Sequence, residues 1–224
     1  MNKQHPIKGI GWTDYTWNPV KGLCPVWCWY CYARKMQKRF HPTIGFEYSM
    51  TELGKPLELK KPSKIFVESV FELFHPVVTG GVRDAIFRII KQCPQHTFQI
   101  LTKMPENIDR PMPDNVWLGV SITNDDKIYA LYQDLLDAEA RVKFISFEPL
   151  FLNLHYLPVR IDWAIIGRLT GHGHKYDPSL AKLEYMVKAY KKEKVPVFLK
   201  NNLVPIMGEE YIKKHQEFPE GGKR

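Results

Sequence analysis

The sequence predicts an α/β protein whose parallel sheet curves into a partial or complete barrel. After residue 60, short apolar runs rich in β-branched and aromatic residues alternate with amphipathic helical stretches, which is the pattern of βα units in a parallel sheet. The chain has 224 residues, of which 44% are hydrophobic, so one substantial core can form. Six or seven βα units in a chain of this length favour a barrel-like arrangement.

Six strands follow from the apolar runs. They cover 64–69, 96–103, 116–122, 142–148, 162–167 and 196–201, and one more is expected near Gly9 to Thr13. Between them, apolar residues recur at helical spacing over 82–90, 128–136 and 180–190. Asp177-Pro178 fits a capped start of the last helix, with the proline in its first turn. We expect one domain over 1–207 and a polar tail over 208–224, whose end frays from Pro219.

Polar residues stand where the predicted strands end. In a barrel the chemistry lies at this rim, because loops vary there while strands hold them rigidly. The rim residues that we select as candidates are Glu68, Ser69, Thr102, Lys103, Ser121, Glu148 and Lys200.

Charge and composition limit the partners. Lys and Arg number 32 against 24 Asp and Glu, a net charge of +8, which suits a polyanionic partner but also an ordinary cationic surface. The polar start lacks the apolar region of a signal peptide, and the apolar runs are too short to span a membrane. We therefore expect a cytoplasmic protein with no membrane partner.

Three of the four cysteines, Cys24, Cys28 and Cys31, have the spacing C-x3-C-x2-C, with aromatic Tyr30 before the last. Three thiolates can hold three irons of a [4Fe–4S] cluster and leave the fourth iron open, whereas clusters that only carry electrons normally take four cysteines. The alternative is a structural zinc site with a fourth ligand such as His41 or His75. No second cysteine pair accompanies the motif, which favours the cluster.

The cysteine spacing, the aromatic residue and the βα pattern together resemble the radical-SAM superfamily. Further stretches resemble a narrower radical-SAM-like family associated with phages and prokaryotes, which is similar to spore photoproduct lyase only at the level of the superfamily. They include Gly11-Trp12-Thr13-Asp14, Thr16-Trp17-Asn18-Pro19, Cys31-Tyr32-Ala33, Leu101-Thr102-Lys103, Phe147-Glu148-Pro149-Leu150 and Phe198-Leu199-Lys200. The resemblance covers most of residues 9–203 and names no substrate.

The resemblance implies a partial (β/α)6 TIM-like barrel with the cluster loop at 24–31. It also implies that the open iron binds the amino and carboxylate groups of S-adenosylmethionine (SAM). An electron from the reduced cluster then cleaves SAM to methionine and a 5′-deoxyadenosyl radical, which abstracts hydrogen from a substrate. An external electron donor such as a flavodoxin or a ferredoxin is needed.

Specific roles at the rim are expectations of the same kind. Glu68, Ser69 or Glu72 would meet the SAM ammonium group, although the Gly-Gly-Glu sequence of the superfamily is absent and a capping or solvated glutamate is the alternative. Lys103 and Lys200 would meet a carboxylate or phosphate, or lie in salt bridges instead. Glu148 would bind ribose hydroxyls or pair with a cation. Thr102, Ser121 and Tyr30 complete the candidate cofactor-binding set.

Cys93 stands apart from the motif. Its weak S–H bond suits return of a hydrogen atom to a product radical, but a cysteine between a helix and a strand is more often buried and inert. The tryptophans near the motif, among them Trp12, Trp17, Trp27 and Trp29, could stack on a base or simply belong to the core.

The sequence thus predicts a radical-SAM enzyme that acts on a nucleic acid or nucleotide, with DNA repair or base modification as the favoured reaction. Modification of a peptide or small metabolite is the alternative among enzymes, and a zinc-bearing nucleic-acid-binding module is the alternative without catalysis.

Overall fold

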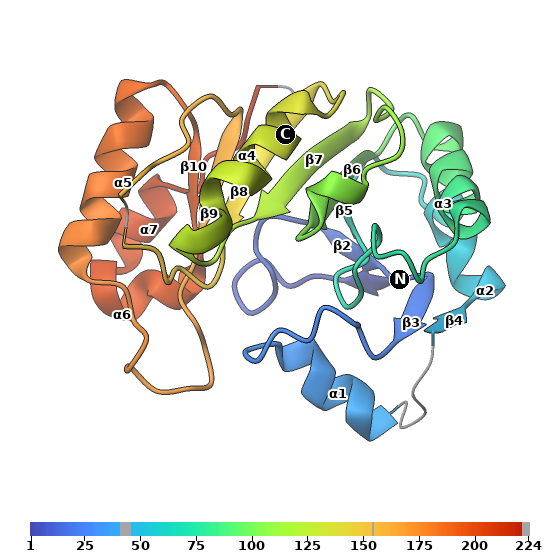
Figure 1. Cartoon of the computed structure of the whole chain (residues 1–224), viewed down its shortest axis with the longest axis horizontal. Coiled ribbons are helices and arrows are strands. Elements are labelled where there is room, and N and C mark those ends of the chain that lie inside the picture. Colours follow the sequence, from blue (N-terminus) through green and yellow to red (C-terminus); the bar gives the residue numbers. More distant parts are fainter. Residues whose placement is uncertain (41–45, 154, 221–224) are drawn as a thin grey trace.

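The chain folds around one curved, open sheet of eight strands (Figure 1). The computed structural model describes residues 1–40, 46–153 and 155–220. The strands of this sheet lie side by side in the order in which they occur along the chain, whereas β3 (Val20–Gly22) and β4 (Phe46–Tyr48) belong to a separate sheet. In order across the sheet they are β1 (Asn2–Lys3), β2 (Tyr15–Trp17), β5 (Lys64–Val67), β6 (Thr97–Thr102), β7 (Val116–Ser121), β8 (Val142–Phe147), β9 (Trp163–Ile166) and β10 (Val197–Leu199).

All neighbouring pairs from β2 to β10 are parallel, and β1 alone runs antiparallel, beside β2. The α/β class and the six strands predicted after residue 60 are confirmed, with strand ends within two residues of those expected. The prediction of a strand near Gly9 to Thr13 is wrong. Gly11 turns the chain there with a φ of 86°, and the extended segment comes later, as β2.

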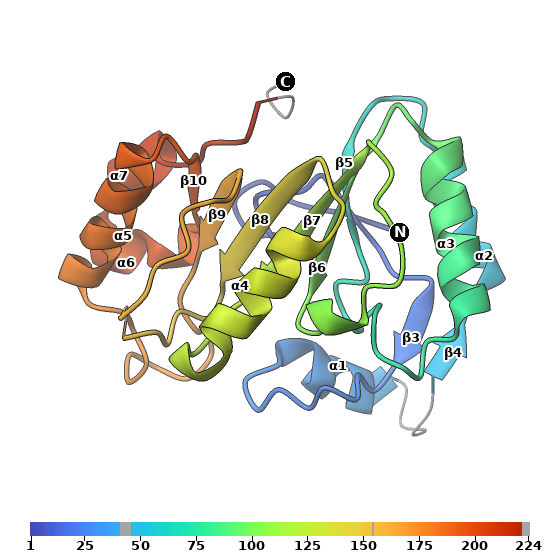
Figure 2. The same cartoon turned by 45° about the horizontal axis from the view of Figure 1, so that its top comes forward.

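Three helices cover one face of the sheet (Figure 2). They are α3 (Gly80–Gln92), α4 (Ile128–Asp137) and α5 (Leu180–Lys192). Their buried residues pack with the side chains that point to this face from the strands, in the larger of two hydrophobic clusters. This follows from the strand order, because right-handed crossovers that always step in one direction put every helix on the same side.

The start of α5 differs in detail from the prediction. Its N-cap is Ser179, whose hydroxyl accepts a hydrogen bond from the Lys182 backbone N–H. Pro178 therefore precedes the cap and is not in the first turn. Asp177 instead forms a salt bridge with Arg168, 2.9 Å apart.

The inner face of the sheet carries a second hydrophobic cluster without helices. Trp12 lies at its centre, with ring centroids 4.7 Å from Phe66 and 6.1 Å from Trp163. The amide of Gln99, on β6, donates to the Trp12 carbonyl oxygen over 3.1 Å. This aromatic layer closes the amino-terminal end of the sheet's concave side and leaves the carboxyl-terminal end open for a pocket.

Smaller elements follow β2, β4 and β10 along the chain. After β2, the strands β3 (Val20–Gly22) and β4 (Phe46–Tyr48) form a separate antiparallel pair, and α1 (Tyr32–Phe40) lies between them in sequence. Helix α2 (Met50–Leu53) follows β4, and α6 (Val204–Met207) follows β10. His41, considered as a zinc ligand, lies outside the described residues.

The segment expected as a polar tail is folded up to Pro219. Helix α7 (Glu209–Lys214) buries Ile212, and the chain then pairs with the edge of β10 through Gln216. Phe218 stacks on Trp163 at 5.4 Å. A few apolar residues among many charged ones are thus enough to dock this segment, while residues 221–224 lie outside the described part.

The sheet ends at β1 and β10, so it is not closed into a barrel. Within the described residues, no helix has the length and apolar character needed to cross a membrane.

Candidate functional site

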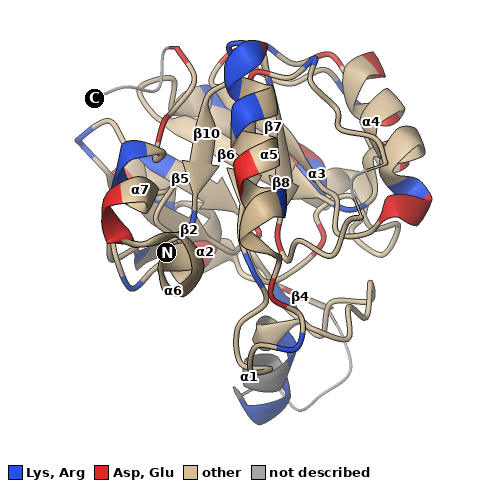
Figure 3. Cartoon of the chain, turned by 90° about the vertical axis from the view of Figure 1, so that its left-hand side faces the viewer, with Lys and Arg blue, Asp and Glu red and all other residues tan. Residues whose placement is uncertain are grey.

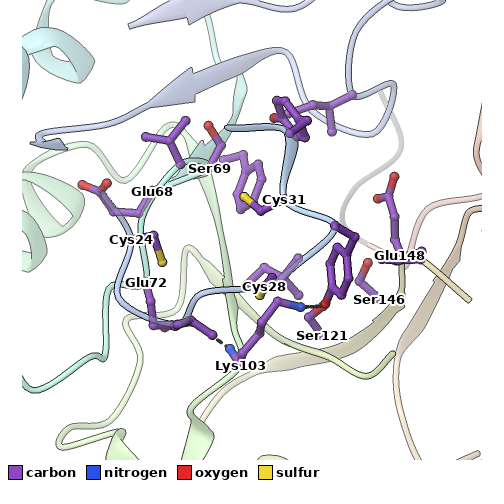
Figure 4. Close-up of a pocket in the computed structure, with 18 of the residues that line it drawn as sticks. Cys24, Cys28, Cys31, Glu68, Ser69, Glu72, Lys103, Ser121, Ser146 and Glu148 are labelled. Atoms are coloured by element: carbon purple, nitrogen blue, oxygen red, sulfur yellow. Dashed lines mark hydrogen bonds between the residues drawn. The ribbon is translucent and has the colours of Figure 1, made fainter. Parts of the chain in front are cut away.

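A pocket of about 240 Å³ opens at the carboxyl-terminal ends of the parallel strands, beneath the loop 24–31 (Figure 4). All three motif cysteines line it. So do eight of the nine candidate cofactor-binding residues, namely Tyr30, Glu68, Ser69, Glu72, Lys103, Ser121, Glu148 and Lys200. The chain thus brings together side chains from the cluster loop and from the ends of successive strands, as parallel topology requires.

The three cysteines are free thiols and half-buried. The backbone N–H of Cys31 donates to the Cys28 carbonyl oxygen over 3.1 Å, which tightens the loop between these two residues. Burial raises the pKa of the Cys24 thiol to about 11, and the negative charge of Glu72 contributes to the rise. A thiol in this environment becomes a thiolate only with a compensating positive charge such as a metal.

Cysteine thiols bind zinc and iron–sulfur clusters in different arrangements. A zinc ion gathers its ligands around one point, whereas each cysteine of a [4Fe–4S] cluster binds a different iron. In the described part of the chain, no three Cys, His, Asp or Glu side chains are placed to hold a single ion. Figure 4 shows the sulfur atoms of Cys24, Cys28 and Cys31 apart from one another around the pocket. Three free thiols around one pocket are a donor set that fits a [4Fe–4S] cluster.

Glu72 supports the neighbouring strand end. Its buried carboxylate accepts hydrogen bonds from the Thr102 hydroxyl at 2.6 Å, the Lys103 backbone N–H at 2.8 Å and the Phe74 N–H at 3.2 Å. Burial raises the pKa of Glu72, and these hydrogen bonds oppose the rise. Thr102 is fully buried, is not among the pocket-lining residues and has its hydroxyl committed to Glu72. Both residues thus position the backbone from which Lys103 projects.

Glu68 is the most strained polar residue of the pocket. Its φ is 56°, in the left-handed region that glutamate rarely adopts. The side chain is 3% exposed. One carboxylate oxygen accepts the Val20 N–H at 2.8 Å, and the other is buried with no hydrogen-bond partner among the described residues. Strain and an unpaired acceptor at one residue are typical of a functional site.

Glu68→Gln is expected to stabilise the protein at pH 8 by about 1 kcal/mol or more, because the neutral amide avoids the cost of burying a group that is ionised in the unfolded chain. Burial raises the pKa of Glu68 well above 4.5, so the folded chain binds more protons than the unfolded chain above that pH. Stability therefore falls as pH rises from 4.5 to the folded-state pKa, and it stays lower beyond. The gain from Gln should be absent near pH 4.

Urea unfolding at pH 4, 6 and 8 measures this difference. Glu72→Gln is the matched control, because the amide that replaces one oxygen would face a backbone N–H donor, and this variant should be less stable than the parent at pH 8. Equal stability gains for both variants would contradict the assignment of the unpaired oxygen to Glu68.

The inner-face hydroxyls lie side by side. Ser121 and Ser146 are paired in the register of β7 and β8. The Lys103 ammonium donates to the Ser121 hydroxyl over 2.6 Å, while the buried Ser146 hydroxyl has no partner in the described structure. Ser146 was not selected from the sequence for a binding role, although its inward position follows from the alternation along β8. The Tyr30 hydroxyl donates to Thr123 at 3.4 Å.

Glu148 and Lys200 form a salt bridge across the pocket wall. Gly167 lies behind this pair, and a Cβ at that position would come within 3.0 Å of Lys200 and 3.3 Å of Glu148. The absence of a side chain at Gly167 therefore leaves room for the pair. Of the interpretations open for Glu148, pairing with a cation is the one observed.

The Ser69 hydroxyl and backbone N–H both donate hydrogen bonds to the side-chain oxygen of Asn18, over 3.1 and 2.7 Å.

Cys93 lies far from the pocket. It caps the carboxyl-terminal end of α3, is 1% exposed within the main core and precedes β6, at the opposite end of the strand from Lys103. This position favours the structural interpretation of Cys93 over the hydrogen-donor role.

The tryptophans separate into two groups. Trp12 and Trp17 are buried in the core, whereas Trp27 and Trp29 are 55% and 58% exposed on the cysteine loop. Sequence reasoning missed that Trp29 meets Phe151 and Tyr176, because these residues come from distant loops whose proximity no local pattern records.

Comparison with known proteins identifies a family. Neither the curated proteins nor the solved structures include a match to this chain. A family described as protein of unknown function (DUF5131) matches residues 8–203. This range contains the cysteine loop, the seven parallel strands of the sheet from β2 to β10 and every pocket residue discussed above. The chain belongs to the DUF5131 family.

Proposed function

We propose that this protein is a radical-SAM enzyme, in which Cys24, Cys28 and Cys31 hold a [4Fe–4S] cluster and the adjoining pocket binds SAM. The observation that carries the proposal is that three free thiols, spaced for three irons, line one pocket with the polar ends of parallel strands. The open parallel sheet with all its major helices on one face is compatible with the partial (β/α)6 barrel of such enzymes.

The pocket offers groups of both charges to a zwitterionic ligand. The buried oxygen of Glu68 is an acceptor for an ammonium group, and the ammonium groups of Lys103 and Lys200 are donors to a carboxylate. Glu148 offers carboxylate oxygens to ribose hydroxyls if it exchanges part of its contact with Lys200. Ser146 adds a buried hydroxyl without a partner in the described chain.

When bound, the cluster would supply one electron to the sulfonium of SAM, which then separates into methionine and a 5′-deoxyadenosyl radical. The electron comes from a flavodoxin or ferredoxin in our proposal, and the reducing cytoplasm keeps the thiols free. The protein contributes binding, orientation and exclusion of water. The aromatic layer around Trp12 closes the pocket from below, and Glu72 fixes the backbone of Lys103.

A nucleic acid or nucleotide is the proposed substrate, with DNA repair or base modification as the reaction. The net charge of +8 supports it. Modification of a peptide or small metabolite is a second candidate, but enzymes of the peptide type commonly carry a second cluster, for which only Cys93 remains. The zinc-bearing module is the third, and the absence of a second cysteine pair from the sequence disfavours it.

The test is anaerobic purification and reconstitution of the wild-type chain with iron and sulfide, followed by reduction with dithionite in the presence of SAM. We expect a brown protein with acid-labile sulfide and chromatographic detection of 5′-deoxyadenosine. A colourless protein that carries stoichiometric zinc and forms no 5′-deoxyadenosine would refute the proposal and favour the binding module.

A further inference from the structure

A surface groove of about 340 Å³ lies beside the pocket and is lined by aromatic rings from three separate segments. Trp29 comes from the cysteine loop, Phe151 follows β8 and Tyr176 precedes α5. The Trp29 and Phe151 rings stack at 5.7 Å with planes 12° apart, and Tyr176 lies 5.4 Å from Trp29. The His172 ring also contacts Trp29, with centroids 5.6 Å apart. Trp29 is nevertheless 58% exposed, so a large part of its ring surface is available to a ligand.

The groove adjoins the candidate active site. Tyr30, the residue after Trp29, lines the pocket, and its ring lies 5.5 Å from Trp29 and 5.7 Å from Phe151. A ligand on the Trp29 face therefore lies next to whatever occupies the pocket.

The edge of the groove is cationic. Lys182 lines it, and the Lys175 ammonium lies 5.2 Å from the Tyr176 ring centroid. The one carboxylate in the lining, Asp177, is engaged by Arg168 at 2.9 Å and by His174 at 2.7 Å. Helix α5 starts at the groove, and Lys182 in its first turn donates to the Leu152 carbonyl oxygen over 2.6 Å. The other lysines of α5, namely Lys188, Lys191 and Lys192, lie toward the far end of the helix (Figure 3).

Flat aromatic faces beside lysine side chains are a combination that binds single-stranded nucleic acid, because bases stack on rings while lysines meet phosphates. We propose that the Trp29–Phe151–Tyr176 groove holds an unpaired base of a nucleic-acid strand next to the pocket. This inference rests on the proposed function for its substrate class. What it adds is the position at which the nucleic-acid strand binds on the protein surface.

The experiment measures binding of a fluorescently labelled single-stranded oligodeoxynucleotide to the anaerobically purified full chain, in parallel with an abasic strand of the same length. Trp29→Ala should weaken binding of the base-bearing strand by roughly 5- to 150-fold, the range for loss of one base–aromatic stack. It should leave the weaker binding of the abasic strand unchanged, since the phosphate contacts remain.

Trp27→Ala is the matched control on the same loop. Trp27 is equally exposed, but its ring is covered by the Arg34 guanidinium at 3.5 Å and does not line the groove. Away from the loop, Tyr176→Ala should weaken binding, Tyr176→Phe should preserve it, and Tyr185→Ala, at an exposed tyrosine on α5, should have no effect.

Equal affinities for Trp29→Ala and the parent would overturn the inference. The exposed aromatic rings would then be interpreted as a surface that binds a protein partner. No binding of the strand to a parent protein that still forms 5′-deoxyadenosine would overturn the inference alone. Stacking-dependent binding without 5′-deoxyadenosine formation would support the groove and refute the radical-SAM proposal, so the two failures are distinguishable.

Discussion

A Cys28→Ala variant is expected to lose the cluster and to form no 5′-deoxyadenosine above background, while Cys93→Ala retains both. Cys28 is the middle cysteine of the motif in sequence and lines the pocket. Without its thiolate, the [4Fe–4S] cluster would have only two protein ligands. Alanine is preferred to serine because a serine oxygen can still bind iron. Iron and sulfide content, visible absorption and chromatography of the reaction products measure the effect.

Cys93→Ala controls for loss of a cysteine as such. Its side chain lies in the core at the end of α3, so the expected cost is about 1 kcal/mol of stability for the small cavity. Cluster content that survives in Cys28→Ala, or falls equally in Cys93→Ala, would count against the assignment of the motif. Normal 5′-deoxyadenosine formation combined with loss of substrate turnover in Cys93→Ala would revive the hydrogen-donor role.

The fold was predictable because its signals are local. Each strand after residue 60 is a short apolar run, and each covering helix shows a stripe at helical spacing, as in Leu183, Met186, Val187 and Tyr190 of α5. Since parallel strands place their carboxyl ends on one edge, the polar residues that follow these runs were predicted to meet. Lys103, Ser121, Glu148 and Lys200 do meet at the pocket.

The roles within that edge were not predictable from spacing. Glu68 and Glu72 are four residues apart in the sequence, and no local pattern distinguishes them. In the structure, three donors form hydrogen bonds with Glu72, whereas one oxygen of Glu68 has no partner within the described residues. Thr102 faces the helix side of β6 and Lys103 the pocket. These roles depend on which hydrogen-bond donors other segments of the folded chain place beside each side chain. A local sequence pattern does not contain that information.

Long-range packing also decided the fate of the aromatic residues. Trp12 fills the concave face because Phe66, Phe144 and Trp163 converge there from three strands. Trp29 remains exposed because its partners, Phe151 and Tyr176, are loop residues at the surface. The docking of the segment after Gly208 likewise depends on the uncovered edge of β10, which the segment's own composition does not reveal.

Gly119→Ala is expected to destabilise the fold by roughly 3 kcal/mol or more, at the upper end of the cost of overpacking a core. Gly119 lies on the inner face of β7 directly opposite Phe144 on β8. A Cβ there would lie 2.3 Å from two atoms of the Phe144 ring and 2.6 Å from a third. The ring is fully buried against Trp163 and Trp12, so it has little room to retreat.

Urea unfolding monitored by circular dichroism measures the loss. Gly81→Ala is the control, because a Cβ in this second position of α3 meets nothing within 4 Å, and alanine in a helix should be neutral or stabilising by up to about 1 kcal/mol. The three contacting atoms are the outer atoms of the Phe144 ring, which leucine lacks. Phe144→Leu should therefore restore part of the stability of Gly119→Ala, with a coupling energy of about 1 kcal/mol or more in the double-mutant cycle. Additive effects would mean that the two positions do not contact each other. The close packing of Gly119 against Phe144, next to Ser121 and Ser146 on the same two strands, would then be wrong.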